Sequence, residues 1–195
     1  MRPYINNGNM NIFPINFHSP YYPSVENLLI SSFPADERRD VELQRQYADH
    51  HLKFTVYAVC EAEKFVGFFT LWNLEEFSFI EHFAVLPSLR GKGYGTRILQ
   101  YIKEIVKHPL LLEIEIPVTK FQQLRQLFYE KNEFSKLDLP YFQPPYRAGG
   151  ECIPMHLMMY GYFEASESEE LRKKVGECVA KIYAEVYSFN PIVEA

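Results

Sequence analysis

Three glycines at alternate positions constrain this chain more than any other feature of its sequence. They lie in the segment Arg-Gly-Lys-Gly-Tyr-Gly-Thr, residues 90–96. A β-branched and aromatic run precedes the segment and an apolar stripe at helical spacing follows it, so we expect it to join a strand to a helix. Glycines let successive backbone N–H groups point into one concavity, and the start of a helix adds unpaired N–H groups. With the charges of Arg90 and Lys92, this pattern predicts a cradle for a diphosphate.

Two common diphosphate loops do not match this segment. The loop of nucleotide triphosphatases needs Gly-Lys followed by Ser or Thr, whereas this segment ends Gly95-Thr96 with no lysine between them. The dinucleotide fingerprint opens a βαβ unit with G-x-G-x-x-G, whereas here the third glycine comes one residue early. The runs before the loop also favour three strands, 54–60, 65–72 and 77–86, whose short links predict an antiparallel meander.

The remaining pattern predicts helices and strands in an order typical of one α/β domain. Before the meander we expect a helix that begins at Ser24 and a second that runs from Pro34 to about Tyr47. After the loop we expect a helix with an apolar face made of Ile98, Leu99, Ile102, Ile105 and Val106, and then a strand over 110–116. A second helix is expected over 119–131, with Phe121, Leu124, Leu127 and Phe128 on one side. A short strand over 134–137 and a last strand over 154–160 complete the predicted elements.

Three segments organise the chain. Residues 1–15 carry turn-forming Asn and Gly and are expected to form an N-terminal arm. Residues 16–162 contain the predicted domain, and residues 163–195 are expected to form a C-terminal helical extension, with Ser166 and Glu169 as its capping box. The apolar face of that helix must be buried either on the domain or on a partner chain, which would make a homodimer.

Composition argues against several classes of binding partner and cellular compartment. The formal net charge is −5 and no basic face is evident, so nucleic acid is not expected as a partner. We expect neither a signal peptide nor a membrane-spanning run, and three distant cysteines suggest neither disulfides nor a metal site. We therefore expect a cytoplasmic protein without a metal cofactor.

Two motifs resemble the GNAT acetyltransferase superfamily. The first is Arg-x-x-Gly-x-Gly on Arg90, Gly93 and Gly95, after a meander that ends Val-Leu-Pro. The second is Leu-Phe-Tyr-Glu-Lys-Asn-Glu-Phe, residues 127–134, which is similar to the family's Leu-Tyr-Glu-Lys-x-Gly-Phe segment. This chain departs from the pattern at Glu133, where the family usually has glycine, and at Gln122, where it often has asparagine. The resemblance implies the mixed-sheet acyl-CoA N-acyltransferase fold, α/β (α+β), with an antiparallel N-terminal meander and flanking helices.

The resemblance also implies a reaction and a cofactor site. An acetyl group would pass from acetyl-CoA directly to a primary amine of a small molecule or peptide, without a covalent enzyme intermediate. The loop would hold the diphosphate, and the backbone of the preceding strand would pair with the pantetheine arm. The implied cofactor-binding residues are Phe83, Ala84, Val85, Arg90, Gly91, Lys92, Gly93, Tyr94, Gly95 and Thr96.

Two catalytic residues are expected on this basis. Tyr129 is the candidate acid for the leaving thiolate, because it lies about 100° around the helix from Phe128 and points away from the apolar side. Glu81 is the candidate base, because it shares a strand face with Phe83 and Val85 and because burial would raise its pKa. Glu115 or water are alternative proton acceptors, while His82 is expected to be structural.

The acceptor amine stays open in the sequence. Tyr141, Phe142, Tyr146 and Arg147 could wall its site, and Arg38 and Arg39 would favour an anionic substrate unless they lie on a solvated helix face. Two other functions fit a fold of this class. One is a non-catalytic acyl-CoA sensor, and the other is an interaction protein built on the C-terminal helix, which would not bind CoA.

Overall fold

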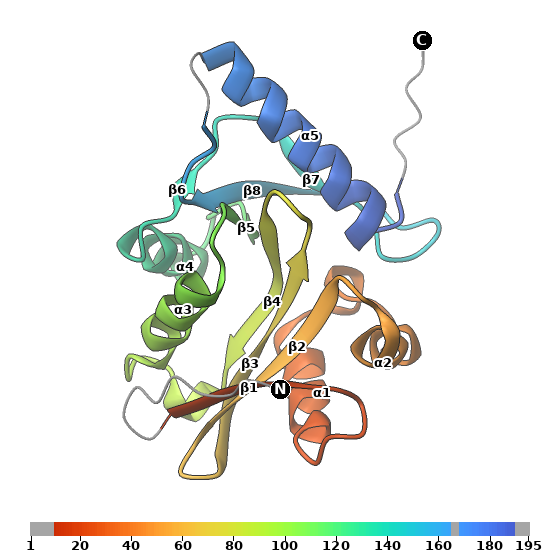
Figure 1. Cartoon of the computed structure of the whole chain (residues 1–195), viewed down its shortest axis with the longest axis vertical. Coiled ribbons are helices and arrows are strands. Elements are labelled where there is room, and N and C mark those ends of the chain that lie inside the picture. The colour runs from red at the N-terminus through yellow and green to blue at the C-terminus, as the bar shows by residue number, and fades with distance from the viewer. Residues whose placement is uncertain (1–9, 165–167, 190–195) are drawn as a thin grey trace. The chain divides into compact units, whose positions relative to one another are not determined.

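The computed structural model describes residues 10–164 and 168–189, which contain eight strands, five α-helices and two short 3₁₀ helices (Figure 1). The chain divides into two compact units. Unit 1 comprises Met1–Asn73 and Ile80–Lys107, and unit 2 comprises Leu74–Phe79 and His108–Ala195. No helix among the described residues is long and apolar enough to cross a membrane.

The strands of unit 1 run in the order β1-β2-β3-β4, and the pairs β1–β2 and β2–β3 are antiparallel. Their bounds are β1 Met10–Ile15, β2 Phe54–Glu61, β3 Lys64–Asn73 and β4 Ser78–Val85, whose first two residues belong to unit 2. These bounds confirm the predicted meander. The β2–β3 link is tight, because Ala62 and Glu63 both take the left-handed conformation, at φ 46° and 64°.

Residues 10–15 correct the expected N-terminal arm. They form β1, in which Met10 and Ile12 are buried and every residue pairs with β2. The alternation of buried and less buried positions is the period of a strand, and pairing with a distant segment outweighs the local turn signals. The part of the predicted arm before residue 10 lies outside the described residues.

The helices of unit 1 differ from the predicted ones at their starts. Helix α1 (Tyr22–Ser32) begins before Ser24, with a proline in its first turn. The second predicted helix is two elements, η1 (Ala35–Glu37) and α2 (Val41–His50). Asp40 caps α2 by accepting a 2.9 Å hydrogen bond from the Leu43 N–H, which is why the helix starts there. Helix α3 (Tyr94–Ile105) follows η2 (Pro87–Leu89) and the glycine loop. It buries Ile98, Leu99 and Ile102 of the predicted stripe, whereas Ile105 is 38% exposed and Val106 is the C-cap of the helix.

Unit 2 is arranged around one strand, β8 (Ile153–Tyr160). It pairs antiparallel with β5 (Leu110–Glu115), β6 (Ser135–Lys136) and β7 (Tyr141–Gln143). Helix α4 (Lys120–Lys131) connects β5 to β6, and helix α5 (Ser168–Val186) ends the unit. The strand β7 lies between the predicted strands over 134–137 and 154–160, where the sequence pattern predicted no strand.

The apolar face of α5 is buried within unit 2. Val175, Cys178, Ile182 and Val186 are each less than 10% exposed. Lys181 forms a 2.7 Å ion pair with Glu75, and the Tyr187 hydroxyl just after the helix donates to Glu113. These four apolar side chains therefore need no partner chain to cover them. The predicted cap residue Ser166 lies outside the described residues.

Candidate functional site

The glycine loop of unit 1 presents bare backbone donors. Gly91 and Gly93 have φ values of 74° and 84°, which other residues rarely adopt, and a Cβ added to either would meet no atom within 4 Å. Gly93 is the N-cap of α3, and no side chain among the described residues caps this helix. The first N–H groups of α3 therefore have no side-chain cap at the positive end of the helix dipole. This is the geometry that an anion would use.

The charged side chains of the loop take different positions. Arg90 turns back to the end of β4, where its Nε donates to the Val85 carbonyl at 3.1 Å. This contact holds the loop closed against the strand that precedes it. Lys92 is exposed at the tip of the loop, so its ammonium can reach a bound anion.

The end of β4 is packed tightly against β3. A Cβ on Gly67 would lie 2.4 Å from the Ala84 carbonyl oxygen, which is backbone and cannot move aside. The Leu86 N–H donates to the Val66 carbonyl at 2.9 Å, beyond the strand's last residue. Ala84 is buried, while Phe83 and Val85 are partly exposed. Glycine at position 67 therefore allows the close approach of β3 to the backbone of Ala84 and Val85, two of the three predicted pantetheine-binding residues.

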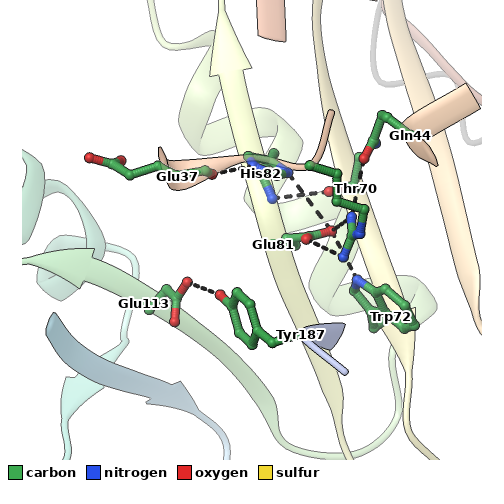
Figure 2. Close-up of polar contacts among 9 residues, drawn as sticks. Glu37, Gln44, Thr70, Trp72, Glu81, His82, Glu113 and Tyr187 are labelled. Atoms are coloured by element: carbon green, nitrogen blue, oxygen red, sulfur yellow. Dashed lines mark hydrogen bonds and ion pairs between the residues drawn. The ribbon is translucent and has the colours of Figure 1, made fainter. Parts of the chain in front are cut away.

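Glu81 lies in a closed polar cluster of unit 1 rather than at an open surface (Figure 2). Its carboxylate forms a two-point ion pair with the Arg39 guanidinium, with Nη2–Oε1 at 2.5 Å and Nη1–Oε2 at 2.9 Å. The Glu81 side chain is 0% exposed and the Arg39 side chain 2%. The Trp72 indole donates a third hydrogen bond at 2.9 Å, and Gln44 accepts one from Arg39 at 3.1 Å. Both charges are thus paired and hydrogen-bonded, which is the condition under which buried charges are tolerated.

The environment of Arg39 is aromatic as well as acidic. Its guanidinium lies 4.6 Å from the ring centroid of Tyr47, 5.3 Å from that of Trp72 and 5.5 Å from that of Phe54. Such contacts stabilise a desolvated cation. Arg39 is therefore neither on a solvated helix face nor free to bind an anionic substrate, and both expectations for it are wrong.

The pKa of Glu81 moves opposite to the expected direction. Burial alone would raise it, but the charge of Arg39 and the hydrogen bonds from Arg39 and Trp72 outweigh burial, so the pKa lies below its ordinary value. His82 is also buried, and burial lowers its pKa, so it is neutral near pH 7. Its backbone N–H donates to Thr70 at 3.0 Å and its Nε2 lies 3.0 Å from the Glu37 carbonyl, which agrees with a structural role.

Tyr129 lies on α4 in unit 2 and is 8% exposed, which makes it the buried residue of that helix. Burial raises its pKa to about 12, so the hydroxyl keeps its proton at neutral pH. The predicted helix is present, but its apolar side is largely exposed: Phe121, Leu124 and Leu127 are 57%, 56% and 47% exposed. Tyr129 packs instead against two aromatic rings: its ring centroid lies 5.1 Å from that of Phe128 and 5.7 Å from that of Phe134.

The two departures from the family motif each have a structural outcome. Glu133 takes the left-handed conformation, with φ 64°, at the position after the last turn of α4. The Phe134 N–H donates to the Tyr129 carbonyl and the Glu133 N–H to the Glu130 carbonyl, which completes a Schellman cap despite the missing glycine. Gln122 forms a capping box with Thr119, where its Oε1 accepts from the Thr119 N–H at 2.8 Å. Its carboxamide oxygen is thus used by the helix start.

The other predicted residues of unit 2 are held by local partners. Glu115 is ion-paired with Arg125 of α4. Tyr141 is 2% exposed and donates to Glu113 at 2.7 Å, so it is a packing residue of β7 rather than an exposed wall. The Tyr146 ring lies 4.9 Å from that of Tyr187. Figure 2 shows the contact of Tyr187 with Glu113, a partner that sequence reasoning did not identify.

Comparison with known proteins supplies the family. A family model described as the acetyltransferase (GNAT) family matches residues 22–134. A GNAT-family protein from Bacteroides thetaiotaomicron is 34% identical, with a TM-score of 0.85, and the match covers 92% of this chain and 99% of that chain. The predicted α/β acetyltransferase fold is therefore confirmed. No match was found among curated proteins.

More distant structures share the fold alone. A GNAT acetyltransferase from Elizabethkingia anophelis with acetyl-CoA bound is 19% identical, at a TM-score of 0.53, over 79% of this chain and 99% of that chain. A chimera built on spermidine N-acetyltransferase from Vibrio cholerae is 16% identical, at a TM-score of 0.57, over 78% of this chain and 95% of that chain.

Proposed function

Because the chain belongs to the acetyltransferase (GNAT) family, we propose that it moves an acetyl group from acetyl-CoA to a primary amine by direct attack. The observation that carries this proposal is the uncapped start of α3 behind two left-handed glycines. Acetyl-CoA, as the second substrate, supplies a thioester that an amine can attack. The chain must then bind the diphosphate, align the acyl group and provide for two proton movements.

The loop residues fit a diphosphate. The N–H groups of Tyr94, Gly95 and Thr96 start α3 without a side-chain cap, and Gly91 and Gly93 leave room where other residues would place a Cβ. Such an arrangement favours a phosphate at a helix start. We assign the diphosphate to residues 90–96, with Lys92 and Arg90 adding positive charge.

The pantetheine arm is assigned to the backbone of Phe83, Ala84 and Val85. A strand end can bind an extended amide chain by adding it as a further strand. The close approach at Gly67 supports the assignment, since it packs the backbone of Ala84 and Val85 tightly against β3. A fixed N–H there would stabilise negative charge on the acyl oxygen during attack.

Tyr129 is proposed as the proton donor to the leaving thiolate. With a pKa of about 12 its hydroxyl stays protonated, and among the described residues it has no hydrogen-bond partner that would compete for that proton. The Schellman cap at Glu133 and the Phe134 ring fix its backbone and side chain. A donor held in one direction serves a leaving sulfur better than a mobile one.

The two side chains predicted as proton acceptors, Glu81 and Glu115, are both held in ion pairs. Glu81 stays a prediction, and its paired, hydrogen-bonded carboxylate counts against it, because a lowered pKa weakens proton acceptance. Glu115 is likewise ion-paired. Proton loss to water requires neither residue. A pH profile of kcat/KM in Glu81→Gln decides the matter: a base role predicts loss of the acidic limb, whereas a positioning role leaves that limb in place.

Binding of CoA tests the loop assignment. In isothermal titration we expect CoA to bind the wild-type chain and to bind Gly93→Ala at least about tenfold more weakly, because a left-handed alanine costs about 1–2 kcal/mol and alters the cradle. Gly149→Ala is the matched control. Gly149 has φ 79° and equally open surroundings but lies in unit 2, outside the loop. Equal CoA affinity in both variants would contradict the assignment.

Acetyl transfer tests the reaction. Mass spectrometry of a polyamine, an aminoglycoside and a peptide amino terminus, each incubated with acetyl-CoA and the protein, should show a gain of one acetyl group on at least one. A Tyr129→Phe variant separates catalysis from binding, since it should bind CoA with unchanged affinity. Tight CoA binding with no transfer to any amine would favour a non-catalytic sensor.

A further inference from the structure

A carboxylate outside the glycine loop holds the start of α3. Glu61, the last residue of β2, accepts a hydrogen bond from the Tyr94 hydroxyl on Oε2 and one from Arg97 Nη1 at 3.2 Å on Oε1. Tyr94 and Arg97 are the first and fourth residues of α3, and the guanidinium of Arg97 lies 5.6 Å from the Tyr94 ring centroid. We call these three residues the Glu61 cluster. All of them belong to unit 1.

The position of Glu61 is fixed by the sheet. Its register partners are Met10 on β1 and Lys64 on β3, so its backbone is paired on both sides. The left-handed turn at Ala62 and Glu63 follows directly. A carboxylate on a strand end that is paired on both sides can serve as a rigid anchor for the start of α3.

The charges within the Glu61 cluster are balanced. The hydrogen bonds from Tyr94 and Arg97 lower the pKa of Glu61, so the carboxylate is ionised at neutral pH. The same contact with Glu61 raises the pKa of Tyr94, so its hydroxyl stays a donor. Arg97 offsets the negative charge that Glu61 would otherwise place beside a diphosphate.

We infer that Glu61 is a positioning residue for acetyl-CoA binding, which rests on the proposed function of residues 90–96. By holding the side chains of Tyr94 and Arg97 on the sheet, it directs the N–H groups of residues 94–96 towards the diphosphate. Tyr94 thus contributes to the cofactor site through its backbone, while its side chain serves as the tether. Neither Glu61 nor Arg97 belongs to the glycine motif.

A pure charge effect and a positioning effect predict opposite results. If Glu61 acted only through its charge, Glu61→Ala would remove a negative group and strengthen CoA binding. A positioning role predicts weaker binding, because the first turn of α3 loses its tether. Tyr94→Phe removes one hydrogen bond without changing any charge, so only the positioning role predicts an effect for it.

The experiment is titration of CoA into wild type, Glu61→Ala, Tyr94→Phe and the double variant. We expect the Kd of CoA to rise about tenfold in Glu61→Ala and less in Tyr94→Phe. The double variant should bind CoA no more weakly than Glu61→Ala, because both changes break the same Tyr94–Glu61 hydrogen bond. In Glu61→Ala the loss should therefore appear in the KM for acetyl-CoA more than in kcat. Thermal melting should show little change, since about a third of each ion-pair side chain is exposed.

The matched control is Glu26→Ala. It removes two 2.8 Å hydrogen bonds to Arg45, also in unit 1, and should leave CoA binding unchanged. Unchanged or tighter CoA binding in Glu61→Ala, or an equal loss in Glu26→Ala, would overturn the inference. If the wild type itself fails to bind CoA, the proposed function of the loop fails instead.

Discussion

Replacing Arg39 by methionine should invert the pH dependence of stability. The substitution leaves Glu81 with its burial and its Trp72 hydrogen bond but without its counter-charge. Both side chains are at most 2% exposed, so no solvent screens the loss. Removing one partner of a buried ion pair costs about 3–5 kcal/mol, because the remaining charge is uncompensated. Methionine keeps much of the apolar contact with Tyr47 and Trp72 but not the cation–π attraction.

The sign follows from the pKa of Glu81 in each protein. In the wild type it lies below the unfolded value of about 4.3, so the pair stabilises the fold above that pH and the contribution is lost as the pH falls through the folded pKa. In Arg39→Met, burial dominates and raises the folded pKa above the unfolded value. The variant is then most stable below about pH 4.3 and loses that stability as the pH rises through the raised pKa.

Urea denaturation followed by circular dichroism, from pH 3 to pH 8, measures both effects. At pH 7 we expect the free energy of unfolding to fall by about 3–5 kcal/mol, which for a chain of this size lowers Tm by on the order of 10 °C. Arg45→Met is the control, because its ion pair with Glu26 leaves 35% of the arginine side chain exposed, and only a small change in Tm is expected. A loss below about 1 kcal/mol, or parallel pH profiles, would refute the reasoning.

Three further substitutions test single features. Glu133→Gly should raise the free energy of unfolding by about 1 kcal/mol in urea, because glycine adopts φ 64° without strain, and a destabilised variant would contradict the Schellman cap. Gly67→Ala should lower the free energy of unfolding by about 1–3 kcal/mol, because the added Cβ clashes with Ala84. Gly176→Ala is the control and should not destabilise the protein, because its Cβ would meet no atom within 4 Å. Equal melting temperatures of the two variants would disprove the close approach. Tyr129→Phe should lower kcat about 100-fold with little change in the Kd of CoA, and an unchanged kcat would remove its role as acid.

Local signals in the sequence predicted most of the elements. The β-branched and aromatic runs located β2, β3 and β4, and the spacing of Ile98, Leu99 and Ile102 located α3 with its buried face. These signals work because propensity and burial agree at each position. The strand β1 was missed because its pairing partner β2 begins about 40 residues later, and no local pattern reports such pairing.

Helix α4 shows a different limit. Its apolar residues Phe121 and Leu124 suggested a buried stripe, yet both are more than half exposed, while Tyr129 is buried. Periodicity identifies which residues share a helix face, but it does not tell which face the rest of the chain covers. The family motif pointed to Tyr129, whereas the apolar pattern alone drew attention to Phe121 and Leu124.

The roles of the carboxylates depend on partners that the sequence does not place. Glu81 and Arg39 are 42 residues apart, and Glu61 and Tyr94 are 33 apart, so neither pair is visible as a local pattern. When its partner is unknown, a carboxylate on a strand near a cofactor site suggests a catalytic base, because burial would raise its pKa. With Arg39 in contact, the same burial strengthens the ion pair and the pKa falls. A carboxylate in this fold therefore accepts protons or holds a cation according to which positive charge the fold brings to it, and the Glu61 cluster puts the second of these roles beside the glycine loop.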